Sequence, residues 1–435
     1  MSNHPHDAGQ LIYELVRELF PICRSITGAG FRETLQRLQT HIPLVVHEVP
    51  SGTPVFDWTV PKEWNIRDAY VKNARGKRVI DFQESNLHVM SYSVPVHLTL
   101  SLSELMTHLY TMPEHPEWIP YRTSYYTEDW GFCLSHHQLT ALEDAEYEVR
   151  IDSTLADGHL NYGECYVQGD TPHEVLISCH SCHPSLCNDN LSAMGLAVEL
   201  IRFLRQEPRR YSYRCLFIPG TIGSITWLAL NEAVVPNIRH GLLLSCLGDS
   251  GSMTYKQSRR GNAGIDRAAR HVLEHSGEPH TILEFTPYGY DERQFCSPGF
   301  DLPLGCIMRT PNGQYPEYHS SADNLDFVQP EFLRDSLEKC IRIVEVLEAD
   351  EVYVNLNPHC EPQLGRRGLY AGLGGQRALP EDELALLWVL NLSDGRHSLL
   401  DIAERANMDF RQIHNAARGL RAHNLLRRAK EPTGG

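Results

Sequence analysis

Residues 174–200 read EVLISCHSCHPSLCNDNLSAMGLAVEL, and this stretch decides the fold. Its apolar start, Val175 to Ile177, predicts a buried strand, and from Ser192 onward the apolar side chains change to helical spacing. The polar residues between these segments therefore lie in a loop that follows a strand. Open α/β sheets bind ligands at the carboxyl ends of their strands, so this position favours a functional site.

Side chains that bind metals are concentrated in this loop. Five residues of this stretch offer thiol, imidazole or carboxylate ligands close together: Cys179, Cys182, His180, His183 and Asp189. Zinc accepts nitrogen, sulfur and oxygen ligands, so the sequence predicts a zinc site that further residues complete. The alternative is that one histidine caps the strand and both cysteines are small buried hydrophobic residues.

Strands and helices alternate through most of the chain. Patterns of apolar residues predict strands near residues 147–151, 214–218, 240–247 and 303–309, and helices over 11–20, 31–38, 192–204, 265–275 and 332–347. Alternation of this kind predicts an α/β domain with a mostly parallel central sheet flanked by helices. We expect residues 1–44 and 131–356 to form it.

The segment between these two parts has a different character. Residues 45–130 contain short β-rich runs separated by turns with proline and glycine, which predicts a small β-rich domain inserted into the larger one. Its aromatic stretch, residues 118–126, either lines a cleft beside the site or packs between the two domains.

The C-terminal part predicts a separate module. Residues 357–379 are rich in glycine and are expected to be a linker. Residues 380–435 contain three helical segments, 381–392, 398–406 and 409–422, in the order of a winged helix. Several arginines in the last segment are compatible with nucleic acid, but such modules also bind proteins, and this alternative stays open.

Composition excludes several classes of protein. The 435 residues are 42% hydrophobic, which is typical of globular chains, and the net charge of -16 argues against nucleic acid or an anionic membrane as the main partner. The twelve cysteines are scattered, no signal segment precedes them, and no apolar run reaches the ~20 residues of a membrane span. We therefore expect a cytoplasmic protein without a membrane partner; a homo-oligomer is compatible with the sequence.

The pattern of strand, histidine, loop, Asp-Asn and helix resembles the first metal segment of the co-catalytic zinc aminopeptidase family. Relatives of this family include leucyl aminopeptidases, glutamate carboxypeptidases and glutaminyl cyclases. Its order of histidine, bridging aspartate, glutamate pair, acidic residue and late histidine falls on His180, Asp189, residues 218–224, Asp249 and His319. More closely, the whole chain resembles a bacterial group that adds a nested β domain and a C-terminal winged helix. The resemblance implies one or two zinc ions held by these residues.

Two departures from the family pattern concern the chemistry. The loop 218–224 contains no glutamate, and Gly220 stands where one is expected; Cys182 replaces an aspartate that orients the first histidine. Either the second metal is lost, or a nearby group such as Glu292, Glu317 or His183 substitutes, or the protein no longer hydrolyses a substrate. Asp291 matches a family aspartate near the site, so the candidate catalytic residues are Asp291, Glu292 and Cys182.

Four further residues are candidates for substrate binding. Arg259 and Arg260 follow the strand that carries Asp249, where guanidinium groups either bind a substrate carboxylate or face solvent. Tyr318 and Arg293 adjoin the late histidine and the catalytic candidates.

These observations favour a zinc-dependent aminopeptidase-like hydrolase that cleaves an amide bond in a small peptide or amino-acid conjugate. The alternatives are a degenerate ligand-binding protein with a regulatory winged helix, and a zinc acyltransferase or cyclase on the same scaffold.

Overall fold

A large mixed sheet organises the first of two compact units in this computed structural model, which describes residues 7–370 and 380–429. The first unit comprises residues 1–266 and 281–338, and the second comprises 267–280 and 339–435. The large sheet has eight strands in the order β1 (Val45–Pro50), β10 (His159–Val167), β12 (Ser212–Ile218), β11 (Glu174–His180), β13 (Ile238–Leu244), β16 (Leu304–Met308), β14 (Met253–Lys256) and β15 (His280–Leu283).

The four central strands of this sheet are parallel, as predicted. β12, β11, β13 and β16 run in the same direction, while β1, β10 and β14 pair antiparallel at the sides, so the sheet is mixed. Every residue of β11 is buried, which agrees with the apolar run Val175–Ile177 in the strand. Parallel register pairs His180 with Ile218, so the loops after β11 and β12 leave the sheet side by side.

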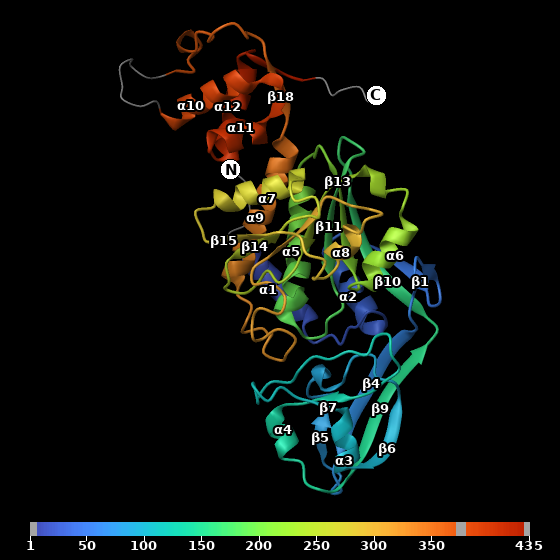
Figure 1. Ribbon diagram of the computed structural model, residues 1–435. Helices are drawn as coiled ribbons and strands as arrows, with labels where there is room; N and C mark the ends of the chain where they lie inside the picture. Colours follow the sequence, from blue (N-terminus) through green and yellow to red (C-terminus); the bar gives the residue numbers. More distant parts are fainter. Residues whose placement is uncertain (1–6, 371–379, 430–435) are drawn as a thin grey trace. The chain divides into compact units, whose positions relative to one another are not determined.

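Helices flank this sheet (Figure 1). The first unit includes α1 (Ala8–Leu19), α2 (Ala29–Gln39), α5 (Ala193–Leu204), α6 (Ile222–Leu230), α8 (Glu292–Phe295) and the start of α9 (Pro330–Ala349). It also includes two short helices, α3 (Leu102–Leu105) and α4 (His136–Thr140). α5 packs on β11 and β12, and α1 packs on α5. Ten of the twelve residues of α5 are buried, because it lies between the sheet and α1.

The β-rich insertion has different bounds from those predicted. Its four-stranded sheet has the order β5 (Arg78–Asp81), β4 (Glu63–Lys72), β9 (Glu146–Ala156) and β6 (Val96–Ser101). The strand predicted near 147–151 is present within β9, but it pairs with β4 and β6 and not with the large sheet. Conversely, β1, which we expected in the insertion, pairs with β10 at the edge of the large sheet.

The second unit contains a three-stranded sheet and three helices in its C-terminal part. The sheet has the order β18 (Asp394–Ser398), β17 (Val352–Asn355) and β19 (Leu426–Arg428), and the helices are α10 (Glu381–Leu392), α11 (Leu399–Ala406) and α12 (Phe410–Ala422). All three helices were predicted. β17 was assigned to the larger domain, yet it pairs with β18 and β19, so this module begins before the expected linker. Residues 371–379 of that linker and residues 430–435 lie outside the described residues.

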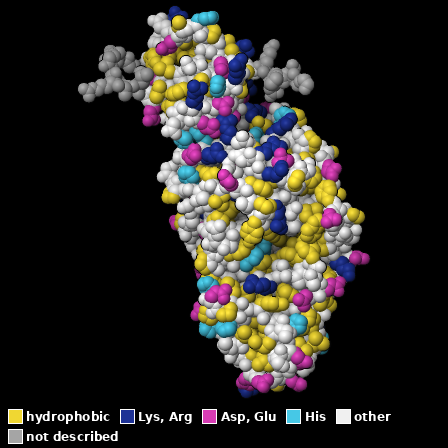
Figure 2. Space-filling model, in the orientation of Figure 1, with side chains coloured by type: hydrophobic (Ala, Val, Ile, Leu, Met, Phe, Trp, Pro, Cys, Tyr) yellow, Lys and Arg dark blue, Asp and Glu magenta, His cyan; other side chains and the backbone are white. Residues whose placement is uncertain are grey.

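Two surface properties of the described residues bear on partners. None of the described helices combines the length and the apolar composition that crossing a membrane requires. On the face that Figure 2 shows, acidic and basic side chains of the described residues are interspersed, with no large basic area. Two arginines of the C-terminal module are engaged by carboxylates of their own unit, Arg411 by Glu345 and Arg428 by Glu351.

Arg214 on β12 links the two neighbouring strands, β10 and β11, through ion pairs. Its guanidinium contacts Glu164 of β10 at 2.5 Å and Glu174 of β11 at 2.8 Å, and Glu174 is 3% exposed. We expect Arg214→Met to destabilise the protein by roughly 3–5 kcal/mol, because it leaves a buried carboxylate unpaired. Urea unfolding followed by circular dichroism measures this. Arg67→Met, which removes an ion pair from a 75% exposed arginine, is expected to leave the midpoint nearly unchanged, and equal effects of the two changes would contradict the assignment.

Candidate functional site

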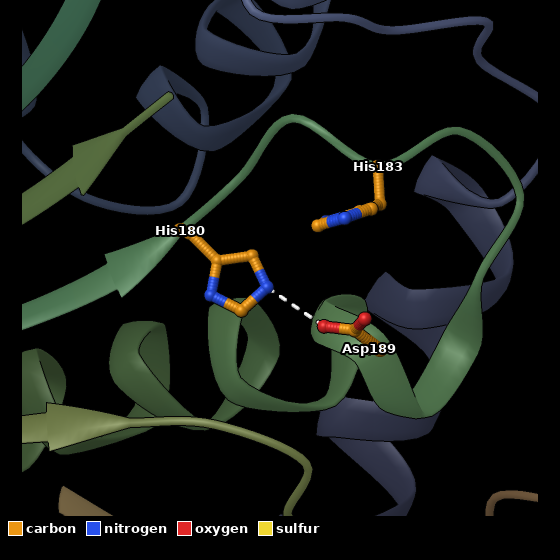
Figure 3. Close-up of side chains that lie close together, drawn as sticks. All are labelled: His180, His183 and Asp189. Carbon is orange, nitrogen blue, oxygen red and sulfur yellow. Dashed lines mark hydrogen bonds and ion pairs between the residues drawn. The ribbon is translucent and has the colours of Figure 1, made fainter. Parts of the chain in front are cut away.

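The site begins where β11 ends. His180 is the last residue of this strand, and the chain then passes through a loop into the short helical turn η3 (Cys187–Ser192), which carries Asp189. The Nε2 atom of His180 lies 2.7 Å from Oδ1 of Asp189 (Figure 3). The two side chains are 1% and 2% exposed, so this contact is shielded from water.

His319 approaches the other oxygen of the same carboxylate. Its Nε2 atom lies 3.0 Å from Oδ2 of Asp189, so the carboxylate lies between two imidazoles from distant parts of the chain. The side chain of His319 is 31% exposed, in contrast to the buried His180 and Asp189. His319 is therefore the member of this contact that is partly exposed to solvent.

A third imidazole, that of His183, completes the group. His180, His183 and Asp189 each offer a ligand atom, and these atoms lie within 4.8 Å of one another. Figure 3 shows the three side chains facing a common space. Burial lowers the pKa of His183 to about 3, so its ring stays neutral and keeps a lone pair for a metal. Burial alone raises the pKa of Asp189, but the three histidines outweigh it and hold that pKa well below its usual value.

Neighbouring polar side chains fix the loop that carries Asp189. The carboxylate of Asp323 accepts hydrogen bonds from the backbone N–H groups of Asn188, at 2.6 Å, and Asp189, at 2.9 Å. The side-chain amide of Asn190 donates to the backbone carbonyl of His180 at 3.1 Å and accepts from the N–H of Cys246 at 3.0 Å. No role for Asp323 or Asn190 follows from the sequence pattern, although Asn190 directly follows Asp189 and Asp323 lies four residues after His319.

Asp249, an expected ligand, has its carboxylate occupied by other donors. It accepts hydrogen bonds from Asn188 Nδ2 at 2.9 Å, from the N–H of Gly251 at 2.7 Å and from the hydroxyl of Thr310 at 2.6 Å. It is not a member of the group formed by His180, His183 and Asp189. Its observed contacts hold Asn188, and hence the loop before Asp189, in place.

The space beside Gly220 is filled by a tyrosine that the sequence analysis overlooked. A Cβ atom at Gly220 would lie 2.1 Å from both Oη and Cε1 of Tyr290. The ring of Tyr290 packs on His180, with 4.1 Å between ring centroids. Cys182 lies in the same corner, where its sulfur accepts from the N–H of Gly220 at 3.4 Å, and burial raises the pKa of this thiol to about 12. A neutral, buried thiol is a poor nucleophile, so the geometry gives Cys182 a packing role.

The two adjacent acidic candidates have different surroundings. Oδ1 of Asp291 accepts from the N–H of Thr221 at 2.6 Å and from the hydroxyl of Ser224 at 2.9 Å, whereas Oδ2 is buried and has no hydrogen-bond partner among the described residues. Burial raises the pKa of Asp291 to about 6. The carboxylate of Glu292 is instead engaged by Lys256 at 2.7 Å. Asp291 therefore has a free oxygen beside the group, and Glu292 does not.

The four candidates for substrate binding differ in their surroundings. Arg259 and Arg260 both bind Asp301, so their charge is compensated within the protein. Arg293 is exposed on α8. Tyr318 stacks on the ring of His319 with 3.9 Å between centroids and thus forms part of the wall of the site.

The insertion contributes a second aromatic side chain to this wall. Tyr121 packs edge-on against His183 and His319, with centroid distances of 5.1 and 5.2 Å. Its backbone N–H donates to the carbonyl of His319 at 2.8 Å, and Pro120 forms an antiparallel bridge with Ser320. Tyr121 of the aromatic stretch 118–126 is 3% exposed, so it is packed beside the site against the segment that carries His319.

The donor set suits a zinc ion. Neutral imidazoles and one ionised carboxylate are typical zinc ligands, and the three closest members are buried, which disfavours their exchange for water. A cation would also compensate the carboxylate of Asp189, whose side-chain partners are the imidazoles of His180 and His319. We therefore find that the residues present fit the metal that the sequence predicted.

Comparisons with known proteins find two matching family models and a relative at high identity. A family model described as a domain of unknown function (DUF4910) matches residues 13–350, and a winged helix-turn-helix model matches residues 351–428. A protein of Clostridium acetobutylicum, named as a polysaccharide biosynthesis protein with an aminopeptidase-like domain, is 52% identical over 421 residues, which are 97% of each chain.

Solved structures show the same fold. The crystal structure of a Clostridium acetobutylicum protein described as a peptidase has a TM-score of 0.93 at 50% identity and covers 97% of both chains. A zinc aminopeptidase of Bacillus subtilis has a TM-score of 0.58 at 13% identity, with 78% of this chain and 94% of that one covered. An aminopeptidase of Aneurinibacillus has a TM-score of 0.52 at 11% identity, with 78% and 93% covered.

At such low identity the last two comparisons establish the fold alone. The chain therefore belongs to the family described as a domain of unknown function (DUF4910), which has the fold of the zinc aminopeptidases and is followed here by a winged helix-turn-helix.

Proposed function

We propose that the protein is a zinc-dependent hydrolase of aminopeptidase type that cleaves an amide bond in a small peptide or amino-acid conjugate. The observation that carries this proposal is the carboxylate of Asp189 between His180 and His319, with His183 beside them, at the carboxyl ends of parallel strands. The cytoplasmic location that we expect from the sequence remains part of the proposal.

His180, His183 and Asp189 would hold one zinc ion, and His319 would complete its ligands or contact the substrate. When bound, zinc acidifies a water molecule and polarises the scissile carbonyl. The ionised Asp189 would offset part of the charge of the cation, and Asp323 keeps Asp189 in place through the backbone. The exposed side of His319 admits the substrate.

Asp291 is the best candidate for the proton acceptor. The glutamate expected in the loop 218–224 is missing, but Asp291 places a carboxylate against this loop through Thr221 and Ser224. Its free Oδ2 can accept the proton that the attacking water loses and can later return it to the leaving amine. In this proposal a residue from another segment supplies the carboxylate that the loop lacks.

The curated relative suggests a substrate class. Its name refers to polysaccharide biosynthesis, which favours a conjugate in which an amino acid or acyl group is joined to a sugar by an amide. The rival proposal, a ligand-binding regulator without turnover, draws on Gly220, Cys182 and the winged helix-turn-helix. The two proposals differ in whether amide bonds are cleaved.

Zinc content tests the metal site. We expect purified protein to bind about one zinc per chain, and His180→Ala or Asp189→Asn to lose it, because each removes a buried ligand. Mass spectrometry of the metal after dialysis against chelator-treated buffer measures this. His97→Ala, which changes a 69% exposed histidine outside the group, serves as the control. Zinc retained by both ligand variants would mean that the metal binds elsewhere.

Asp291 tests the hydrolase itself. We expect Asp291→Asn to keep its zinc and to lower kcat for aminoacyl amides by roughly 10²–10⁴-fold, the usual contribution of a general base. Because the pKa of Asp291 is raised to about 6, the residue is a base only above this pH, so wild-type kcat/KM is expected to fall as the pH drops below about 6. Asp301→Asn, a change to a surface carboxylate, is the control. Full activity of Asp291→Asn would exclude this role.

A further inference from the structure

Helix α10 of the C-terminal module has two apolar faces. The first face, which includes Leu386 and Val389, is buried, and α10 packs on α11 and α12. The second face carries Leu384, Leu387 and Trp388, which lie one helical turn apart and stay partly exposed; Leu384 is 39% exposed. A helix that is apolar on all sides is normally buried on all sides. The second face of α10 is therefore left without a cover by the part of the chain that the structure describes.

This second face forms one wall of a hollow of about 700 Å³ within the second unit. Further lining residues come from the segment 355–362, including Pro358 and Pro362, so the first part of the expected linker belongs to this wall. Pockets that bind small organic molecules measure roughly 300–1,000 Å³ and are mostly apolar, with a few polar groups. The hollow therefore has the size and the walls of a small-molecule site.

A buried hydroxyl group lines the hollow without a partner. Ser393, at the end of α10, is 2% exposed, and its Oγ atom has no hydrogen-bond partner among the described residues. The backbone of the same residue is satisfied, because its N–H donates to the carbonyl of Val389 at 3.0 Å and its carbonyl accepts from the N–H of Asn355 at 2.7 Å. A buried hydroxyl without a partner is costly, so a bound molecule that forms a hydrogen bond with Ser393 is favoured.

The charged groups of the hollow are acidic. Glu361 and Asp394 line it, and none of its described lining residues is a lysine, arginine or histidine. Burial raises the pKa of Asp394, but the ring of His397 and two backbone N–H groups outweigh burial and lower that pKa to about 2, so Asp394 is ionised at neutral pH. Negative charge attracts a cation and repels a carboxylate or a phosphate. The hollow therefore favours a ligand with a positive charge.

We propose that this hollow is a second ligand-binding site of the protein and that it takes a small organic amine. The apolar body of the amine packs on Leu387 and Trp388. Its ammonium group donates a hydrogen bond to the oxygen of Ser393 and lies beside the carboxylate of Asp394. The inference is independent of the proposed hydrolase, because no residue of the group around Asp189 takes part in it. Since α10 also packs on α11 and α12, a bound amine contacts a helix of the winged helix-turn-helix module itself.

Three probes with the same apolar body test the preference for a cation. Tryptamine, tryptophol and indoleacetic acid all carry an indole ring but end in an ammonium, a hydroxyl and a carboxylate group. In ligand-detected NMR titrations of the full chain, we expect a Kd of roughly 0.1–3 mM for tryptamine, as for other ligands of this size. Binding of indoleacetic acid is expected to be at least about tenfold weaker, with tryptophol between the two. Equal Kd values for the amine and the acid, or no binding of tryptamine, would overturn the proposal.

Substitutions in the hollow locate the bound amine. Leu384→Arg adds a positive charge to the wall at an exposed position that tolerates a polar side chain, and we expect it to raise the Kd of tryptamine roughly tenfold. Ser393→Ala removes the unpaired hydroxyl and is expected to raise that Kd roughly 3–10-fold while the midpoint of thermal unfolding does not fall. Leu230→Arg, at a 51% exposed leucine of the first unit, is the matched control and should keep the wild-type Kd. Wild-type affinity in both Leu384→Arg and Ser393→Ala would mean that the amine binds elsewhere and would overturn the proposal.

Discussion

The contact of one buried carboxylate with two imidazoles determines the arrangement of the first unit. Asp189 is buried, and an ionised carboxylate in a protein interior costs several kcal/mol unless opposite charges or donors compensate it. Compensation requires His180 at the end of a central strand and His319 from a late loop. Asp323 contributes by fixing the loop, since its carboxylate accepts from the backbone N–H of Asp189. The parallel register of the sheet meets this requirement, because it brings the loops after neighbouring strands to one edge.

Local patterns predicted the elements whose formation depends on their own residues. β11 and α5 are almost entirely buried, so their apolar periodicity identifies them without knowledge of their neighbours. The membership of β1, β9 and β17 in their sheets was assigned wrongly, because a short strand joins whichever edge the folded chain brings to it. The edge that a strand joins depends on segments far away in the sequence, and the local periodicity of apolar residues carries no information about them.

In the site, too, some residues were predictable from local sequence patterns and others were not. Histidine and aspartate motifs predicted His180, His183, Asp189 and His319, which the structure brings together, because metal ligands are recognisable by residue type and by position after strands. Asp249 has the right type and position, yet three donors occupy its oxygens, and the sequence does not reveal them. Tyr290 was missed because an aromatic residue gives no motif. The available signal was the glycine at 220, since a missing side chain leaves volume that another residue must fill.

The bridge between Pro120 and Ser320 links the β-rich insertion to the loop that carries His319. Hydrogen bonds on both sides of it, from Tyr121 to the carbonyl of His319 and from Ser321 to that of Ile119, make the two segments a continuous piece of backbone pairing. The insertion is therefore a structural part of the site, because it supports the segment that carries His319. Evolution could trim or exchange it only together with the late-histidine loop, so the two segments are expected to be inherited as one block.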